Sequence, residues 1–293
     1  MDGKLHQEKY AVIRSLASAR RARECDARGG PILQTRLKLY DFRDWSRNAD
    51  SVKLTELDSG EVLFQKEFLR IEKGWNVIDV GARVGYYTIQ AGLRVGSEGK
   101  VLAIEAHPRI YRVLKMNIRL YKLANVIPVC KAVGNETRMV RLFESYDSGG
   151  TSVIAPPSLY SLAKTCDWAR VARWFKLAKK REFTSLIYGY LHNMVFPPTY
   201  VPIDTIDNIV KKKKIDKINL MKIDVQGSEL DVLKGSHIIL EEHIPTLLVE
   251  IHPELAPLKA WKAEDLYGLL RSYGYRLTIQ RRLKNPMVVA RAT

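Results

Sequence analysis

The chain has 293 residues, of which 46% are hydrophobic and 27% are charged, a composition typical of a globular protein with a sizeable core. The sequence contains no run of about 18 apolar residues, so no membrane-spanning helix is expected. The three cysteines form no C-x-x-C pair, which argues against a disulfide framework or a zinc knuckle. The net charge of +16 favours anionic partners, namely nucleic acid, anionic lipid or an acidic glycan. A basic surface without a specific ligand is the alternative.

The N-terminus reads M-D-G-K-L-H-Q-E-K-Y and lacks the apolar core of a secretory signal. With the widely spaced cysteines, this predicts a cytoplasmic protein. Residues 1–72 are interpreted as a basic extension. Apolar residues at helical spacing over residues 10–17, with arginines between and after them, predict a surface or packing helix, or an arm that binds membrane or RNA. Residues 36–72 predict short strands that cover the sheet.

The stretch from Trp75 to Thr88, W-N-V-I-D-V-G-A-R-V-G-Y-Y-T, predicts a buried strand, a tight glycine turn and the start of a helix. Such a turn opens a ligand pocket at the carboxyl ends of the strands in an α/β sheet. Glycine at 81 and 85 lets the backbone approach a ligand. Asp79 adds a carboxylate, which repels a pyrophosphate and suits a cation. The turn therefore favours S-adenosylmethionine (SAM) over NAD, with ordinary packing as the alternative.

A second buried strand, K-V-L-A-I-E, ends in Glu105. An acid at this strand end is placed to bind both ribose hydroxyls of a nucleotide-type ligand; a helix cap before Pro108 is the alternative. The run V-I-P-V-C-K-A-V, residues 126–133, predicts a third strand, and the strand-like M-V-R-L-F follows it.

Residues 155–200 interrupt the alternation of strands and helices. Aromatic side chains alternate there with lysines and arginines, and Trp168, Val171 and Phe175 fall on one helical face. This pattern predicts an amphipathic cationic helix that lies on a membrane, or a lid over the substrate pocket. Aromatic stacking on bases and a helical hairpin that packs on its own domain are further alternatives.

The alternation resumes with a short helix that ends in the lysines 211–214, which favour its negative pole. The strand I-N-L-M-K-I-D then ends at Asp224, and the strand P-T-L-L-V-E-I-H ends with Glu250 and His252. Parallel strands end at the same edge of a sheet, so these side chains should converge with Asp79.

A helix over residues 263–272 and two short strands that form an antiparallel hairpin close the chain. The pattern as a whole predicts an α/β fold with a seven-stranded, mostly parallel sheet and an antiparallel C-terminal strand. Residues 73–293 form this domain, with an N-terminal helical and strand extension before it and the helical insertion 155–200 within it.

Several of these motifs resemble the FkbM family of SAM-dependent methyltransferases, which have the class I Rossmann-like fold. The matching motifs are V-I-D-V-G-A-x-V-G-Y-Y-T, I-E-A-H-P, G-G-T-S-V, V-P-I-D-T-I-D, P-T-L-L-V-E-I-H and the diagnostic K-I-D-V-Q-G-S-E-L-D-V-L-K-G. The resemblance covers the chain from about residue 60 to the C-terminus, apart from the insertion.

The resemblance implies SAM as the cofactor and assigns its binding residues. The glycine turn would hold the methionine part, the acid after the second strand would hold the ribose, and two residues after the third strand would border the adenine. These residues are Asp79, Gly81, Ala82, Gly85, Glu105, Ala132 and Val133. The family commonly has Asn where this chain has Arg83; Arg83 either points outward or the turn binds SAM less conventionally.

Methyl transfer requires in-line alignment and a group that takes the proton of the nucleophile. The family mostly methylates hydroxyl oxygens, and Asp224 is the first candidate for the base; binding of the SAM ammonium is its alternative role. His252 is the second candidate, or it caps the segment that follows. Glu229 caps a helix or takes part in catalysis. No metal site is predicted, and Mg²⁺ between Asp224 and Glu250 is a weaker alternative.

The leading hypothesis is an O-methyltransferase that acts on a glycan or other hydroxylated metabolite, with an anionic or lipid-linked acceptor met through peripheral membrane contact of residues 155–200. The first alternative is an RNA ribose 2′-O-methyltransferase, which the net charge favours. The second is a non-catalytic basic binding module on a methyltransferase fold.

Overall fold

The computed structural model describes residue 67 and residues 70–144, 151–152, 199–252, 261–280 and 285–292. The helix expected within residues 10–17 and the amphipathic helix expected within the insertion lie outside these residues. Within the range 155–200 that was assigned to the helical insertion, the structure describes Thr199 and Tyr200. Both belong to a strand and not to a helix. In the described part of the chain, no helix is long and apolar enough to cross a membrane.

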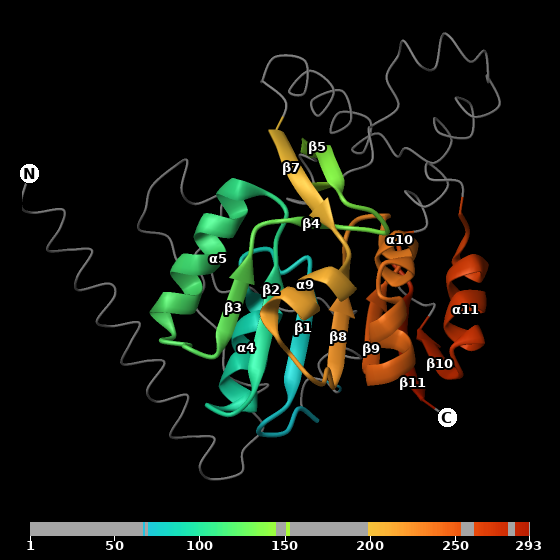
Figure 1. Cartoon of the computed structure of the whole chain (residues 1–293), viewed down its shortest axis with the longest axis horizontal. Coiled ribbons are helices and arrows are strands. Elements are labelled where there is room, and N and C mark those ends of the chain that lie inside the picture. The colour runs from blue at the N-terminus through green and yellow to red at the C-terminus, as the bar shows by residue number, and fades with distance from the viewer. Residues whose placement is uncertain are drawn as a thin grey trace, which may run out of the picture.

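The main sheet of the described residues has seven strands in the order β10-β11-β9-β8-β1-β2-β3 (Figure 1). All pairs from β9 to β3 are parallel, whereas β11 is antiparallel to both of its neighbours. The predicted sheet is therefore confirmed. Its strands are β1 (Asn76–Val80), β2 (Lys100–Ile104), β3 (Val126–Val129), β8 (Leu220–Ile223), β9 (Thr246–Glu250), β10 (Tyr275–Gln280) and β11 (Met287–Ala292).

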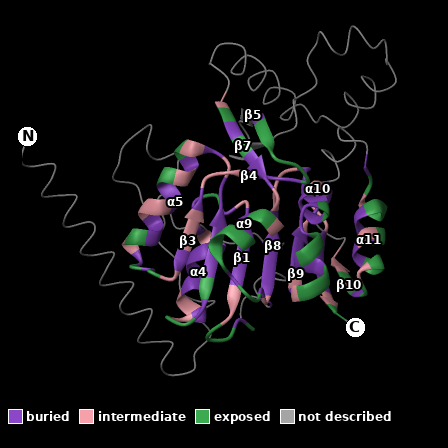
Figure 2. Ribbon diagram, viewed as in Figure 1, coloured by how far each residue is buried: buried purple, intermediate pink, exposed green. Residues whose placement is uncertain are grey.

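Helices cover both faces of this sheet. Neighbouring residues of β1 point to opposite faces, so that Val77 packs in the cluster with the first two helices and Ile78 packs in the cluster with the other three. One face carries α4 (Tyr86–Val95) and α5 (Pro108–Leu120), and the other carries α9 (Ile206–Lys213), α10 (Glu229–Lys234) and α11 (Ala263–Ser272). Because both faces are covered, the central strands are buried almost throughout (Figure 2).

A second sheet, in the order β4-β7-β5-β6, was not predicted. Figure 1 shows β7 and β5 beyond the carboxyl ends of the parallel strands. The expected third strand over residues 126–133 is wrong in its extent, since β3 stops at Val129 and the last two residues pair with β7 in the second sheet. The strands of this sheet are β4 (Ala132–Val133), β5 (Arg138–Glu144), β6 (Thr151–Ser152) and β7 (Thr199–Asp204).

Asp204, at the end of β7, anchors the second sheet to the main domain. Its buried carboxylate accepts hydrogen bonds from Lys131 Nζ at 2.7 Å, Lys212 Nζ at 3.0 Å and Thr137 Oγ1 at 3.2 Å. Burial opposes its charge, but the two lysines outweigh burial and lower the pKa of Asp204 far below its ordinary value. The second sheet is thereby fixed beside the strand ends where the candidate site lies.

Candidate active site

The turn after β1 brings the backbone against the ends of two neighbouring strands. Gly81 has a φ of 79°, and the N–H groups of Gly81 and Ala82 both donate to Ile104 O, each at 2.9 Å. A Cβ on Gly81 would overlap Asp224 O. Gly85, with a φ of 99°, precedes the first turn of α4. Glycine at these two positions therefore allows both the backbone conformation and the close approach.

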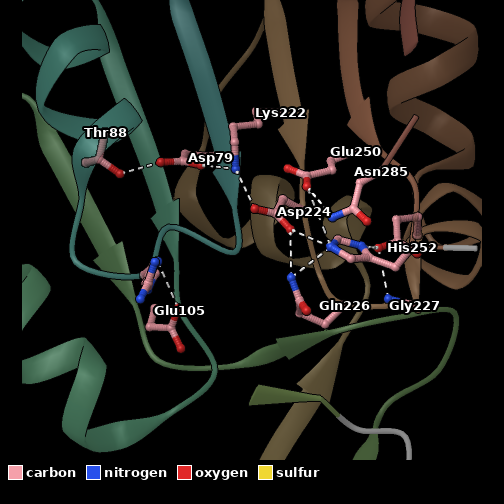
Figure 3. Close-up of polar contacts among 12 residues, drawn as sticks. Asp79, Thr88, Glu105, Lys222, Asp224, Gln226, Gly227, Glu250, His252 and Asn285 are labelled. Carbon is pink, nitrogen blue, oxygen red and sulfur yellow. Dashed lines mark hydrogen bonds and ion pairs between the residues drawn. The ribbon is translucent and has the colours of Figure 1, made fainter. Parts of the chain in front are cut away.

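Asp79 is buried at the end of β1 and has one carboxylate oxygen without a hydrogen-bond partner among the described residues. Its Oδ2 accepts from Thr88 Oγ1 at 2.6 Å, while its Oδ1 lies 3.7 Å from Lys222 Nζ (Figure 3). Burial raises the pKa of Asp79, and the nearby Lys222 opposes this rise. A buried acceptor without a donor is a site for a ligand N–H or cation.

Glu105 lies at the end of β2, and both of its carboxylate oxygens face the backbone. Oε2 accepts from Arg83 N at 2.9 Å, and Oε1 accepts from His107 N at 2.8 Å. Burial raises the pKa of Glu105. Each oxygen keeps a second lone pair, so the carboxylate can still accept from hydroxyl groups.

Arg83 itself has a φ of 51° and an exposed side chain. The left-handed conformation explains why Asn suits this position, since Asn tolerates it better than most residues. Of the two expectations for Arg83, the structure supports the outward orientation. Its backbone N–H, which any residue supplies here, is the group that contacts Glu105.

Lys222 is a buried cation between two acids of neighbouring strands. Its Nζ lies 3.4 Å from Asp224 Oδ2 and 3.7 Å from Asp79 Oδ1, and 4.9 Å from the centre of the Tyr87 ring. Burial works against its charge, but Asp224 and Asp79 outweigh burial and raise the pKa of Lys222. Lys222 therefore stays charged and holds the two carboxylates together.

Asp224 occupies the centre of the site, directly after β8. Oδ1 accepts from Gln226 Nε2 at 3.3 Å and lies 3.7 Å from His252 Nε2 (Figure 3). Burial opposes its charge, but Lys222 and His252 outweigh burial and lower the pKa of Asp224. Its side chain is 26% exposed, in contrast to the buried Asp79, so a molecule from outside can reach this carboxylate.

His252 follows β9, and its ring lies among acidic side chains. Nδ1 lies 2.8 Å from Glu229 Oε1, and Nε2 lies 2.9 Å from Gln226 Nε2. Burial lowers the affinity of the ring for a proton, but the contacts with Glu229 and Asp224 outweigh burial and raise the pKa of His252 to about 9. The imidazole is therefore not an ordinary base with a pKa near neutrality.

Glu250, the last residue of β9, accepts from Asn285 Nδ2 at 2.8 Å. Burial and the nearby Asp224 raise the pKa of Glu250. In the described part of the chain, no group of three or more His, Cys, Asp or Glu is arranged to hold a metal ion. The contact with Asn285 also brings the C-terminal hairpin to the site.

The structure brings most of the predicted site residues to one edge of the sheet. Ala132 and Val133 lie just beyond β3, but both side chains pack into apolar clusters, and their contact with adenine stays a prediction. Sequence reasoning missed the roles of Thr88, Gln226 and Asn285. The signature motif contained a signal for Gln226, whereas Asn285 lies in a stretch without a recognisable pattern.

These residues fit SAM. The unpartnered oxygen of Asp79 suits the ammonium group of its methionine part, and Glu105 suits its ribose hydroxyls, as in the assignment from the resemblance. Lys222 Nζ lies 3.7 Å from this same Asp79 oxygen, Oδ1, which is beyond hydrogen-bond distance. Lys222 therefore neutralises part of the acidic charge while Oδ1 can still accept a hydrogen bond.

Comparison with known proteins agrees with this fit. The family described as "Methyltransferase FkbM domain" matches residues 79–277, more than half of the chain. The chain is 23% identical over 208 residues to "Methyltransferase 1" of Beauveria bassiana, which covers 70% of this chain and 74% of that protein. It is 31% identical over 75 residues to the AMB antimetabolite synthetase AmbE of Pseudomonas aeruginosa, which covers 26% of this chain and 4% of that one.

Among solved structures, the methyltransferase FkbM of Methylobacillus flagellatus KT is 15% identical with a TM-score of 0.47, and the match covers 80% of this chain and 48% of that chain. The chain thus spans about half the length of that structure. The seven-stranded sheet with its antiparallel β11 and the family match together give the class I Rossmann-like methyltransferase fold, with SAM as the cofactor. Because the family model matches residues 79–277, more than half of the chain, the chain belongs to the FkbM family of SAM-dependent methyltransferases.

Proposed function

We propose that the chain transfers the methyl group of SAM to a hydroxyl oxygen of a glycan or other hydroxylated metabolite. The observation that carries this proposal is the carboxylate of Asp224, which is ionised, partly exposed and located at the centre of the candidate site. A methylated hydroxyl that keeps its proton is a strongly acidic oxonium ion and must lose that proton, whereas a methylated amine is stable as an ammonium ion near neutral pH. A carboxylate acceptor at the reacting centre therefore favours oxygen as the nucleophile.

SAM supplies a methyl group on a sulfonium, and the sulfur keeps the electron pair of the broken C–S bond. In the proposed reaction the acceptor oxygen forms the new C–O bond, and its proton passes to Asp224. An oxygen that carries both a methyl group and its proton is a strong acid. Asp224 can accept this proton even though Lys222 and His252 lower its pKa.

The experiment compares wild-type protein with Asp224→Asn in the presence of methyl-labelled SAM and a panel of sugars, polyols and native extracts. Transfer by the variant should fall by about 10²–10⁴-fold, while calorimetry shows SAM affinity within a few-fold. Asp216→Asn, at an exposed position on the approach to β8, is the matched control and should keep full transfer. A label that alkali releases as methanol would identify an ester and contradict hydroxyl methylation.

We further propose that the acceptor is anionic or lipid-linked, which rests on the net charge of +16. Flotation with vesicles that contain or lack anionic lipid tests the lipid part. Binding to anionic vesicles that salt reverses supports it, and absence of binding at low salt contradicts it.

A ribose 2′-hydroxyl of RNA is the second candidate acceptor, because the same carboxylate would serve it and because the exposed lysines 211–214 add to the basic surface. RNA affinity that falls steeply with salt and labelled RNA as the product would favour this candidate. A protein that binds neither SAM nor S-adenosylhomocysteine would leave the non-catalytic binding module.

A further inference from the structure

The ring of His252 is held between acidic side chains from three different elements. On one side, Nδ1 contacts Glu229 Oε1 at 2.8 Å. On the other side, Nε2 lies 3.7 Å from Asp224 Oδ1 and 3.8 Å from Glu250 Oε1. The ring is 2% exposed, so that these neighbours rather than water determine its orientation and charge. Figure 3 shows the imidazole beside Asp224, with Glu250 and Asn285 next to it.

Glu229 is not an ordinary helix cap. It is the first residue of α10, whereas the glutamate of a capping box occupies the third helical position. Its Oε1 accepts from Gly227 N at 2.9 Å and also contacts His252, and the carbonyl of Gly227 accepts from Trp261 Nε1 at 3.2 Å. Since Glu229 is fully buried, a carboxylate here costs free energy unless a partner compensates its charge.

Gln226 connects this pair with Asp224. Its backbone has a φ of 55°, and its amide lies 2.9 Å from His252 Nε2 and 3.3 Å from Asp224 Oδ1. A neutral ring accepts at Nε2 from the amide nitrogen, which also donates to Asp224. A protonated ring donates from Nε2, so the amide of Gln226 must then turn its oxygen toward Nε2. The positively charged ring faces Asp224 in that state. In both states Nε2 faces Asp224, because Glu229 holds Nδ1.

We propose that Glu229 and His252 form a positioning pair that orients the carboxylate of Asp224 and keeps it ionised for the proton of the acceptor. This inference rests on the proposed function, in which Asp224 takes that proton. His252 acts on Asp224 through the charge of its ring at 3.7 Å and is not itself the base, which differs from its role as second candidate base in the sequence interpretation.

The charges around Asp224 show why such a pair is required. Asp79 and Glu250 are carboxylates on β1 and β9, the two strands that flank β8. Their negative charges favour the protonated form of Asp224. Lys222 offsets part of this repulsion from one side at 3.4 Å. Among the described residues, His252 is the other group of potential positive charge in contact with Asp224. The raised pKa of His252, about 9, agrees with this role.

The test combines histidine NMR with pH–rate profiles on the full chain. Nitrogen-15 labelling of histidine follows the protonation of His252 without any acceptor. In the wild-type protein, the Nδ1 proton should persist and the ring should titrate well above pH 6.5. Glu229→Gln, which keeps the shape of the side chain and an amide oxygen for Gly227 N, should move this titration downward toward the ordinary range.

The kinetic part uses the acceptor found for the wild-type protein. Both Glu229→Gln and His252→Gln should lower kcat at least tenfold with SAM affinity unchanged within about threefold. His252→Gln removes the imidazolium and so raises the pKa of Asp224, and the acid limb of its pH profile should move to higher pH. In Glu229→Gln the ring is still protonated at acid pH, so the rate should instead fall as pH rises through the lowered pKa of His252. Glu264→Gln, the same substitution at an exposed position of α11, is the matched control and should leave the titration and profile unchanged.

A histidine that titrates near pH 6.5 in the wild-type protein, or an acid limb that His252→Gln does not move, overturns the positioning pair. Failure of the proposed function has a different signature. In that case His252 titrates as expected and responds to Glu229→Gln, while the labelled methyl group is found on nitrogen, carbon or a carboxylate instead of a hydroxyl oxygen.

Discussion

Gly81 and Asp224 lie in contact through their backbones, so closely that a Cβ on residue 81 would overlap the carbonyl oxygen of Asp224. The contact joins the turn after β1, where the methionine part of the cofactor is expected, to the residue that we propose as the proton acceptor. Gly81 and Asp224 are 143 positions apart in the sequence. Asn76 and Asn219, whose hydrogen bond joins the beginnings of the same two strands, have the same separation of 143 positions. Cofactor turn and reacting carboxylate therefore form one rigid unit.

Substitution of Gly81 by Ala should disrupt this unit. Residue 81 has a φ of 79° and no space for a methyl group, so the free energy of unfolding should fall by about 3 kcal/mol or more. SAM binding should be lost at temperatures where the variant remains folded. Gly74→Ala is the matched control, because φ is 81° there but nothing lies within 4 Å of the added Cβ; its cost should be about 1 kcal/mol. Equal melting temperatures for the two variants would contradict the contact.

Thr88→Val should weaken the binding of SAM through Asp79. The substitution removes the hydroxyl that donates to Asp79 Oδ2 at 2.6 Å, and the loss of a buried hydrogen bond to a charged group costs about 1–3 kcal/mol of stability. An Asp79 that is no longer held in place should bind SAM about tenfold more weakly, equivalent to about 1.4 kcal/mol. Calorimetry measures this, and Thr88→Ser should restore most of the affinity. A serine variant as weak as the valine variant would count against the hydrogen bond.

Removal of the Lys222 charge should destabilise the protein strongly. Lys222→Met leaves Asp79 and Asp224 without their shared counter-ion, and breaking a buried ion pair costs about 3–5 kcal/mol. Adding Asp79→Asn should recover part of this loss, because one of the two carboxylates is then neutral. Urea unfolding measures both effects. Lys100→Met, at an exposed position of β2, should change stability by less than about 0.5 kcal/mol, and losses that simply add in the double variant would contradict the ion pair.

Arg83→Asn should leave SAM binding nearly unchanged. The side chain of Arg83 is exposed, so its charge is screened by water and salt, and the contact with Glu105 comes from the backbone. Asn suits a φ of 51° better than Arg does, so stability should rise by a few tenths of a kcal/mol. Calorimetry with SAM should give affinities within about twofold. A tenfold gain in affinity would mean that the arginine charge reaches the cofactor.

The stability of the protein should fall as pH rises through about 9. His252 has a pKa of about 9 in the folded state and about 6.5 when unfolded. Its contribution is therefore complete below pH 6.5 and is lost as pH approaches 9, a change on the order of 3 kcal/mol. Urea unfolding of the wild-type protein and His252→Gln between pH 6 and pH 9.5 measures the difference. His237→Gln, at an exposed histidine, should keep the wild-type dependence, and a wild-type curve parallel to that of His252→Gln would contradict the raised pKa.

The main sheet could be predicted because its strands are short apolar runs bounded by glycine turns and helices, such as the strand that contains Val77 and Ile78. Local pattern also placed Asp79, Glu105, Asp224 and Glu250 at strand ends, and parallel pairing put those ends at one edge. The second sheet escaped prediction because β4 has only two residues and β7 contains Pro202, which is unusual inside a strand. Its position depends on Asp204 and Lys131, which lie 73 residues apart.

The sequence by itself determined the fold class and which acids share an edge, since both follow from patterns within single elements. Only the tertiary structure decided which charges neutralise one another: that Lys222 lies between Asp79 and Asp224, and that Glu229 holds His252 instead of capping its helix. The physical reason is that the charge state of a buried group depends on neighbours within a few ångströms. Those neighbours come from strands and helices that are distant in the chain, and packing of the core brings them together.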